Sequence, residues 1–371
     1  MRGTWRRYVL AALPFAAAVA GAFILGEIYV RTFLDYVVPV PWQAERSLTY
    51  APAVFARHIF PAEEQTKSEI PGIVYHINSL GYRGEEFSFE KPAGTLRIIF
   101  YGGSSVFDPW CTEGEDWPRR VGDHLRAAGF SNVETINAGI PGHATFDAVG
   151  RLLTEGHLLR PDYVVLSDTW NDLKYFRQEE PILRTLKPIG DGSDPRLRYN
   201  NWLDRLLGNY SQLYTRLRQQ YYDWKYNIGP EGQMPEWEPT TAFGDMGPSQ
   251  YRLDVETFVD LARNAGSEPV LMIEPRLATA DSTEAERARI YYHYVGLTHD
   301  GLVAAYERAE AILREVAAEK QVMLIDSSAA LHGRDEFFVD HVHLNKEGAE
   351  ELSRLVAQAF TNRLGRTMAR N

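Results

Sequence analysis

Short apolar segments alternate with longer amphipathic segments in the part of the chain that follows residue 95. The short segments are continuous and rich in β-branched residues, which is typical of strands buried on both faces. The longer segments have apolar positions at three- and four-residue spacing, which predicts helices that pack by one face. This alternation predicts an α/β fold with a doubly wound sheet of five parallel strands. The predicted strands are 96–101, 132–137, 162–167, 269–274 and 321–326, and the predicted helices are about 117–128, 144–158, 251–265, 283–319 and 345–363.

Residues 174–250 interrupt the alternation and form an insertion. Aromatic residues and leucines recur there at three- and four-residue steps from Trp202 to Trp224, which predicts one amphipathic helix with a broad aromatic face. Residues 228–250 are rich in proline and glycine and predict a loop. Three interpretations of the helix stay open. It packs on the core, it covers the active site as a cap, or it lies on a membrane with its basic residues toward the headgroups, namely Arg205, Arg216, Arg218 and Lys225.

The amino-terminal region has the pattern of a membrane span. Residues 8–26 carry no charge, and these 19 residues would form a helix of about 28 Å, close to the thickness of a bilayer core. Arginines 2, 6 and 7 precede this run, and Glu27 is the first charge after it. The positive-inside rule then predicts a cytoplasmic tip at residues 1–7 and a single-pass anchor at 8–30. The alternative is a signal peptide cleaved after Ala18-Val19-Ala20.

This topology predicts the remaining organisation. The protein is expected in the inner (cytoplasmic) membrane, with the bulk of the chain on the extracytoplasmic, periplasmic side. Residues 31–92 predict a juxtamembrane connector, because four prolines between positions 39 and 61 break regular structure. A catalytic domain is expected at 93–366, with the insertion at 174–250 inside it.

Composition narrows the classes of partner. The net charge of −11 argues against a nucleic-acid partner, because phosphate binding depends on clustered lysine and arginine. Cys111 is the single cysteine, so no disulfide can form within the chain. Cysteine and histidine residues are not spaced as zinc ligands are. The sequence therefore predicts neither a metal nor an organic cofactor.

Two segments far apart in the chain offer the groups of a serine nucleophile. Ser104 follows a predicted strand and two glycines, which allow a sharp turn that leaves the hydroxyl exposed. Asp340 and His343 stand three residues apart before a predicted helix, so a turn can fold the carboxylate onto the imidazole. A histidine that takes the serine proton makes the hydroxyl reactive, and a carboxylate orients that histidine. Ser105 is the adjacent alternative nucleophile, and each segment by itself is also compatible with an ordinary turn or helix cap.

Two further segments offer donors for an oxyanion. Gly142 and Asn171 each follow a predicted strand, as Ser104 does. The carboxyl ends of parallel strands meet at one edge of a sheet, so these three residues are expected to converge. The Ser104 and Gly142 backbone N–H groups and the Asn171 amide would form the oxyanion hole. Asp172 is expected to hold its loop through backbone hydrogen bonds.

The four segments in this order resemble the blocks of the SGNH hydrolases, also called the GDSL esterase/lipase superfamily. Gly102-Gly103-Ser104 stands where that family has Gly-Asp-Ser, Gly142 matches the second-block glycine, Asn171-Asp172 the third block, and Asp340/His343 the Asp-x-x-His block. The resemblance covers about residues 93–365. Gly103 departs from the usual aspartate, and Thr169 departs from the usual third-block glycine.

The resemblance implies a flavodoxin-like α/β fold and a serine esterase that needs no cofactor. Ser104, His343 and Asp340 would be the catalytic residues, and His341 would be dispensable. The substrate would be an ester-bearing small molecule, lipid or glycan. Two alternatives stay open, namely an O-acyltransferase that modifies an envelope polysaccharide and a catalytically silent binding or scaffold module.

Overall fold

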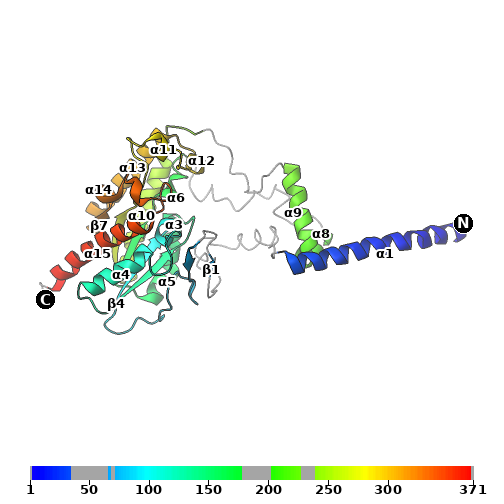
Figure 1. Ribbon diagram of the computed structural model, residues 1–371, viewed down its shortest axis with the longest axis horizontal. Coiled ribbons are helices and arrows are strands. Elements are labelled where there is room, and N and C mark those ends of the chain that lie inside the picture. Colours follow the sequence, from blue (N-terminus) through cyan, green and yellow to red (C-terminus); the bar gives the residue numbers. More distant parts are fainter. Residues whose placement is uncertain (1, 35–65, 68–71, 178–201, 227–238, 369–371) are drawn as a thin grey trace. The chain divides into compact units, whose positions relative to one another are not determined.

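A computed structural model describes residues 2–34, 66–67, 72–177, 202–226 and 239–368 (Figure 1). The chain divides into two compact units. One contains residues 1–50 and 186–235, and the other contains residues 51–185 and 236–371. Most of the predicted connector, the predicted loop up to residue 238 and part of the insertion lie outside the described residues.

The larger unit is built on a sheet of five parallel strands, as predicted. The strands are β3 (Leu96–Gly102), β4 (Val133–Gly139), β5 (Tyr163–Ser167), β6 (Glu268–Ile273) and β7 (Met323–Asp326). Their order is β4-β3-β5-β6-β7, so the chain starts in the interior of the sheet and winds outward in both directions. In β3, Gly102 pairs with Gly139 on one side and with Ser167 on the other. The carboxyl ends of β3, β4 and β5 therefore lie at one edge, where ligands bind in such sheets.

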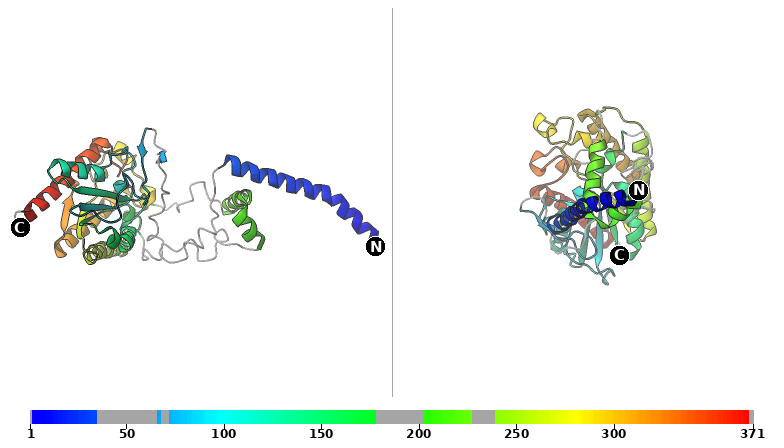
Figure 2. Two further views of the ribbon diagram at one scale, coloured as in Figure 1. Left: turned by 90° about the horizontal axis from the view of Figure 1, so that it is seen from below. Right: turned by 90° about the vertical axis from the view of Figure 1, so that its right-hand side faces the viewer.

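Helices cover both faces of this sheet, as Figures 1 and 2 show. Ile99 and Tyr101 of β3 face α5 (Thr145–Leu159), α10 (Met246–Asn264) and α13 (His299–Glu319), and they share one apolar core with these helices. Ile98 and Phe100 point to the opposite face, toward α4 (Trp117–Ala127) and α15 (Lys346–Met368). Side chains of a strand alternate between the two faces. A strand covered on both faces is therefore apolar along its middle, as 98–101 of β3 and 164–166 of β5 are, which explains why these strands were predictable.

The predicted helix 283–319 is wrong as a single element. The structure has three helices there, α11 (Glu284–Arg287), α12 (Tyr292–Val295) and α13. Gly296 ends α12 in the left-handed conformation, with a φ of 66°. The Thr298 hydroxyl then accepts a hydrogen bond from the Gly301 N–H at 3.2 Å and caps α13.

Four further short helices are described in this unit. They are α3 (Ser104–Phe107), α6 (Trp170–Leu173), α14 (Ser328–Leu331) and the 3-10 helix η3 (Asp335–Phe337).

Residues before position 93 contribute to this unit. The strands β1 (Thr66–Lys67) and β2 (Val74–Tyr75) form a small antiparallel pair. Arg83 is buried, and its guanidinium donates hydrogen bonds to the backbone carbonyls of Phe107, Asp108 and Cys111. The end of the predicted connector therefore supports the loop that follows α3.

The smaller unit contains α1 (Arg2–Phe33), α8 (Trp202–Tyr210) and α9 (Gln212–Tyr226). The predicted single helix from 202 to 224 is thus two helices. They separate at Ser211, whose hydroxyl accepts a hydrogen bond from the Tyr214 N–H at 3.0 Å. A serine in this position starts a new helix, because it satisfies an N–H group of the first turn. Among the described helices, α1 alone is long and apolar enough to cross a membrane, at Leu13–Phe33.

Candidate active site

Ser104 lies at the carboxyl end of the central strand β3. The strand ends at Gly102, and Ser104 is the first residue of α3. The Val106 and Phe107 N–H groups both donate to the Gly103 carbonyl, which turns the chain at this point. Ser104 and His343 are both half-buried, so neither is closed off in the core.

A continuous chain of hydrogen bonds joins Ser104, His343 and Asp340. The Oγ atom of Ser104 lies 2.7 Å from Nε2 of His343. The Nδ1 atom of the same ring lies 2.6 Å from Oδ2 of Asp340. The other carboxylate oxygen, Oδ1, accepts the N–H groups of Val342 and His343, both at 2.9 Å. The Asp-x-x-His segment therefore folds back on itself as its spacing predicts.

The electrostatics of Asp340 determine which ring nitrogen carries the proton. Burial acts to raise the pKa of Asp340, but the hydrogen bond and charge of His343 and the Val342 N–H outweigh it and lower the pKa to about 2. The carboxyl is therefore ionised at neutral pH and only accepts hydrogen bonds. Nδ1 of His343 must then be the protonated nitrogen, which leaves Nε2 free to accept the proton of Ser104. This arrangement converts a serine hydroxyl into a nucleophile.

Asn171 and Gly142 follow β5 and β4, the two strands that flank β3, at the same sheet edge. Asn171 is in α6, after β5, and its Nδ2 donates to the His143 carbonyl at 2.7 Å. An amide nitrogen has two hydrogens, so a second donor remains. Gly142 follows β4 with a φ of 84°, a conformation that favours glycine. A Cβ atom on Gly103 would lie 2.3 Å from Nδ2 of Asn171, so the serine loop and the amide are in direct contact.

Ser105 has a different partner from Ser104. Its hydroxyl donates to Oε1 of Glu274, and Oε2 of the same carboxylate accepts the Trp170 N–H at 2.8 Å. Glu274 is buried and directly follows β6, so it ties the loops after β3 and β5 to the end of a third strand. Ser105 therefore holds the loop, while the hydroxyl of Ser104 faces the histidine.

Tyr294 was not predicted from the sequence as part of the site. Its hydroxyl donates to Oδ1 of Asn171 at 2.9 Å, and Nζ of Lys174 lies 3.3 Å from the same hydroxyl. Glu274 was also missed as a site residue, although its position at the end of a predicted strand was a usable signal. Tyr294 gave no such signal, because it lies in a short helix between two loops.

The other two histidines near the site are buried. His341 is 2% exposed, and its ring packs against Trp170 and Tyr291 with centroid distances of 4.1 and 5.0 Å. Burial lowers the pKa of His341 to about 4 and that of His143 to about 3. Both rings are therefore neutral at pH 7, and His341 has a packing role that its sequence position did not indicate.

Two buried aspartates lie beside Asn171. Asp172 accepts the N–H and the hydroxyl of Thr145, at 3.0 and 2.9 Å, so it holds the loop as expected. Asp168 is 1% exposed, and neither of its carboxylate oxygens has a hydrogen-bond partner among the described residues. Burial, together with the charge of Asp172, raises the pKa of Asp168 well above its usual range.

Thr169 stands where the family's third block usually has glycine. Its φ is −147°, a backbone conformation that does not require glycine.

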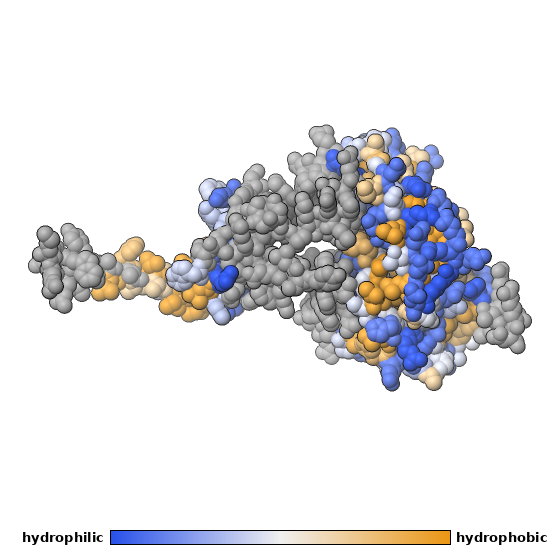
Figure 3. Space-filling model, turned by 180° about the vertical axis from the view of Figure 1, so that it is seen from behind, coloured by the Kyte–Doolittle hydropathy of each residue, from blue (hydrophilic) through white to orange (hydrophobic). Residues whose placement is uncertain are grey.

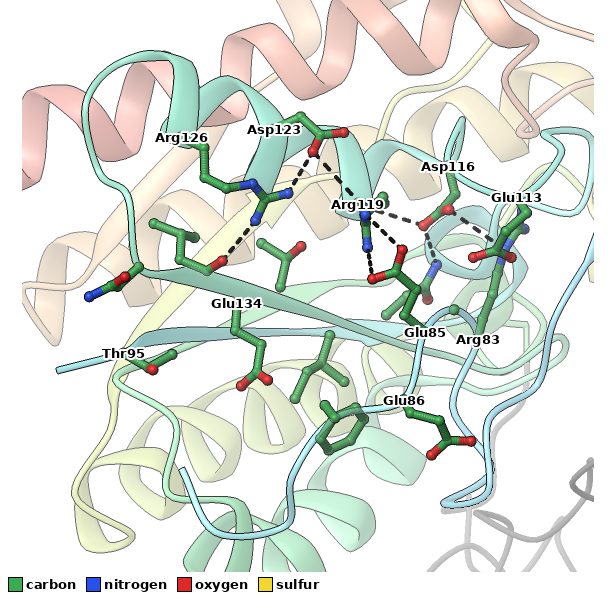
Figure 4. A pocket seen from close by; sticks show the side chains of 17 residues that line it. Arg83, Glu85, Glu86, Thr95, Glu113, Asp116, Arg119, Asp123, Arg126 and Glu134 are labelled. Carbon is green, nitrogen blue, oxygen red and sulfur yellow. Dashed lines mark hydrogen bonds and ion pairs between the residues drawn. The ribbon is translucent and has the colours of Figure 1, made fainter. Parts of the chain in front are cut away.

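A separate polar pocket lies along the edge strand β4 and has a volume of about 440 Å³ (Figure 4). None of its lining residues is a predicted site residue. Its arginines are paired within the protein, since Arg119 bonds to Glu85 at 2.9 Å and Arg126 bonds to the Val133 carbonyl at 2.8 Å. The pocket therefore offers no group to the chemistry at Ser104.

The structure is an α/β fold in which a serine, a histidine and an aspartate are hydrogen-bonded in sequence at one edge of the sheet. Residues 100–351 match the GDSL-like lipase/acylhydrolase family, which is more than half of the chain. The protein therefore belongs to this family of acylhydrolases. Among curated protein sequences, none matches the chain.

The solved structures that are similar to this chain include the following three. A lipase/acylhydrolase from Enterococcus faecalis is 17% identical, with 72% of this chain and 97% of that one covered and a TM-score of 0.42. A GDSL-like lipase from Bacteroides thetaiotaomicron is 13% identical, with coverages of 72% and 89% and a TM-score of 0.39. A variant of an acetylxylan esterase from Geobacillus stearothermophilus is 12% identical, with coverages of 71% and 93% and a TM-score of 0.41.

Proposed function

We propose that the protein is a membrane-anchored serine esterase that hydrolyses acyl esters on the extracytoplasmic side of the inner membrane. The observation that carries this proposal is the hydrogen-bonded chain from Ser104 through His343 to Asp340. The ring of His343 lies within hydrogen-bond distance of the Ser104 hydroxyl on one side and of the Asp340 carboxylate on the other, as nucleophilic catalysis requires.

The reaction has two halves. Ser104 Oγ attacks the ester carbonyl while Nε2 of His343 takes the hydroxyl proton, and the carbonyl oxygen becomes an oxyanion. The Ser104 and Gly142 N–H groups and the free N–H of Asn171 donate to that oxyanion. His343 returns the proton to the leaving alcohol, which leaves an acyl group on Ser104. Water, activated by the same nitrogen, then releases the carboxylic acid and restores the serine. Asp340 stays ionised and stabilises the imidazolium in both halves.

The anchor is proposed from the composition of α1. Leu13–Phe33 is an apolar helix whose large side chains are exposed, and Figure 3 shows hydrophobic residues along its described part. Three arginines stand near the amino end, which favours a cytoplasmic amino terminus. A domain held at the outer surface would meet the acylated glycans and lipid esters of the envelope, and these are the proposed substrate class.

A fluorophosphonate probe tests the nucleophile, because it forms a covalent bond with activated serines. We expect the probe to label the wild type and Ser105→Ala but not Ser104→Ala, and hydrolysis of p-nitrophenyl acetate to follow the same pattern. Ser105→Ala is the matched control, since it removes an adjacent hydroxyl that is bound to Glu274. Absence of labelling in a folded wild type would favour a silent binding module instead.

Fractionation tests the anchor. The protein should remain with membranes after carbonate extraction, and a protease added outside the inner membrane should degrade the larger unit. A soluble mature protein that begins near Gly21 would show that the apolar run is a cleaved signal peptide.

A further inference from the structure

The helices α8 and α9 expose large apolar side chains to solvent. In α8, Trp202, Leu206 and Tyr210 follow one another at four-residue steps and are 74%, 49% and 73% exposed. This spacing places them on one face of the helix. In α9, Leu217, Tyr221 and Trp224 form a similar stripe and are 52%, 50% and 79% exposed. Water is an unfavourable environment for so many exposed aromatic and leucine side chains, and a set of this size marks an interaction surface.

The carboxylate of Glu27 joins these two helices to α1. It accepts hydrogen bonds from the Ser211 hydroxyl at 2.7 Å and from the Gln212 and Leu213 N–H groups, both at 2.9 Å. It therefore caps the first turn of α9, where backbone N–H groups lack partners within the helix. Four residues further along α1, Arg31 pairs with Glu27 and donates to the Tyr210 carbonyl at the end of α8. One ion pair on α1 thus binds both sides of the α8–α9 junction.

Packing and a second ion pair reinforce the arrangement. Leu213 lies against Gly26 of α1, where a Cβ atom would come within 2.8 Å of its side chain. Asp204 of α8 bonds to Arg218 of α9 at 2.7 Å and accepts the Tyr214 hydroxyl at 2.9 Å. The two helices are therefore joined to each other and fixed at the level of residues 26–31.

We propose that α8 and α9 form an interfacial membrane-binding hairpin that lies on the lipid surface where α1 leaves the bilayer. The inference rests on the proposed anchor, because residues 26–31 follow the uncharged run 8–26 and lie at the membrane surface only if that run spans the membrane. Tryptophan and tyrosine are the residues that favour the headgroup region, and leucine favours the acyl boundary below it. Arg205 and Lys225 are exposed on the same helices and suit the phosphates of the headgroups.

Site-directed fluorescence in nanodiscs of phosphatidylcholine and phosphatidylglycerol tests the hairpin in the full chain. An environment-sensitive fluorophore is attached to Tyr221→Cys, to Gln219→Cys and to Val19→Cys. Quenching is then measured with nitroxide lipids labelled near the headgroup or deep in the acyl chain. The wild type is the control for background labelling, because its single cysteine, Cys111, is buried. Gln219 is the matched control, because it is exposed on the side of α9 opposite Tyr221.

We expect the probe at residue 221 to be quenched by shallow nitroxide several-fold more than the probe at residue 219. The probe at Val19, which is 54% exposed on α1, should be quenched by the deep nitroxide, because it lies eight residues before Glu27 and near the middle of the uncharged run 8–26. Equal quenching at 221 and 219, with residue 19 deep in lipid, would overturn the hairpin and leave the anchor intact. Absence of deep quenching at residue 19 would overturn the anchor and the hairpin together.

Removal of the Glu27 cap tests whether the ion pair on α1 positions the hairpin. Glu27→Ala removes both acceptor oxygens, so the probe at residue 221 should lose most of its shallow quenching while the probe at residue 19 keeps its deep quenching. Glu27→Gln retains one acceptor oxygen, so the probe at residue 221 should keep more of its shallow quenching than in Glu27→Ala. Hydrolysis of a small soluble ester should be unchanged in both, which shows that the larger unit is folded. Unchanged quenching at residue 221 in Glu27→Ala would overturn the role of this ion pair.

Discussion

The hydroxyl of Tyr294 donates a hydrogen bond of 2.9 Å to the side-chain oxygen of Asn171. An amide group can rotate so that its oxygen and nitrogen exchange places, and a donor held at one end prevents this. The His143 carbonyl can only accept, so the nitrogen of Asn171 faces it and the loop of Ser104, and the amide oxygen at the other end is held by the Tyr294 hydroxyl. Tyr294 therefore acts as a positioning residue for the proposed oxyanion donor.

Substitution of Tyr294 and Asn171 tests this relationship. Asn171→Ala removes the donor and should lower kcat on the order of 10²–10³-fold, with little change in KM. Tyr294→Phe keeps the ring but removes the hydroxyl, and it should lower kcat about tenfold, which equals about 1.4 kcal/mol in the activation barrier. The double variant should lose no more than Asn171→Ala alone, because the hydroxyl acts through the amide. Steady-state kinetics with p-nitrophenyl acetate measures these effects, and a change confined to KM would reassign Asn171 to substrate binding.

The roles of Asp340 and His343 predict unequal losses of turnover. His343→Ala should lower kcat as much as Ser104→Ala, because the two side chains act as one unit. Asp340→Asn should lower kcat by up to about 10⁴-fold, since the amide can donate to Nδ1 and hold the wrong tautomer. Circular dichroism of each variant should match the wild type. A fully active Asp340→Asn variant would remove this carboxylate from the mechanism.

His341 should be important for stability rather than for chemistry. Its ring fills buried space between Trp170 and Tyr291, so His341→Ala should lower the free energy of unfolding by about 2–4 kcal/mol. His341→Phe, which keeps an aromatic ring in place, should recover most of that loss. Denaturant unfolding measures the stability, and kcat is compared per folded molecule. A loss of kcat equal to that of His343→Ala would show that this ring has a chemical role.

The raised pKa of the Asp168 carboxyl predicts that the stability of the protein depends on pH. Its pKa is raised in the folded state, so the folded state retains a proton that the unfolded chain releases above its ordinary value of 3.8. The free energy of unfolding must therefore fall as the pH rises above that value, by up to about 1.4 kcal/mol per pH unit for one group. Asp168→Asn removes this contribution, so the loss of stability between about pH 5 and about pH 7 should be smaller than in the wild type.

Urea unfolding of both proteins at the two pH values measures the difference. Asp281→Asn is the matched control, because it makes the same chemical change at an exposed position and should leave the slope as in the wild type. An unchanged slope in Asp168→Asn would show that this carboxyl is ionised in the folded protein.

The sheet was predictable because its strands are buried on both faces. The strands β3, β5 and β6 are apolar along their middle, and the boundaries of all five strands differ from the predictions by at most two residues. The helices were less predictable where a local cap divides a periodic segment. The periodicity from Trp202 to Trp224 continues through Ser211, and only the contact with Glu27, 184 residues away, shows that a new helix begins there.

In the candidate site too, residues with a local sequence pattern were predictable and residues that depend on distant contacts were not. Ser104, Asn171 and His343 were identifiable because each lies in a short segment with its own local pattern. Tyr294 and Glu274 support the site through contacts between distant segments, and no local pattern reports such contacts. His341 was interpreted from its place beside His343, although its burial depends on Trp170 and Tyr291, which come from other parts of the chain.

The absence of a side chain at Gly103 has a consequence for how this sequence can change over time. A Cβ atom there would lie 2.3 Å from the Asn171 amide nitrogen and 3.0 Å from the His143 carbonyl oxygen. An aspartate, which the resemblance gives as the usual residue at this position, therefore cannot be introduced until the surroundings of Asn171 have moved. A change in the residues that position Asn171 must therefore come before a side chain at 103, and lineages that carry glycine at 103 should differ from the rest of the family in the residues around the amide.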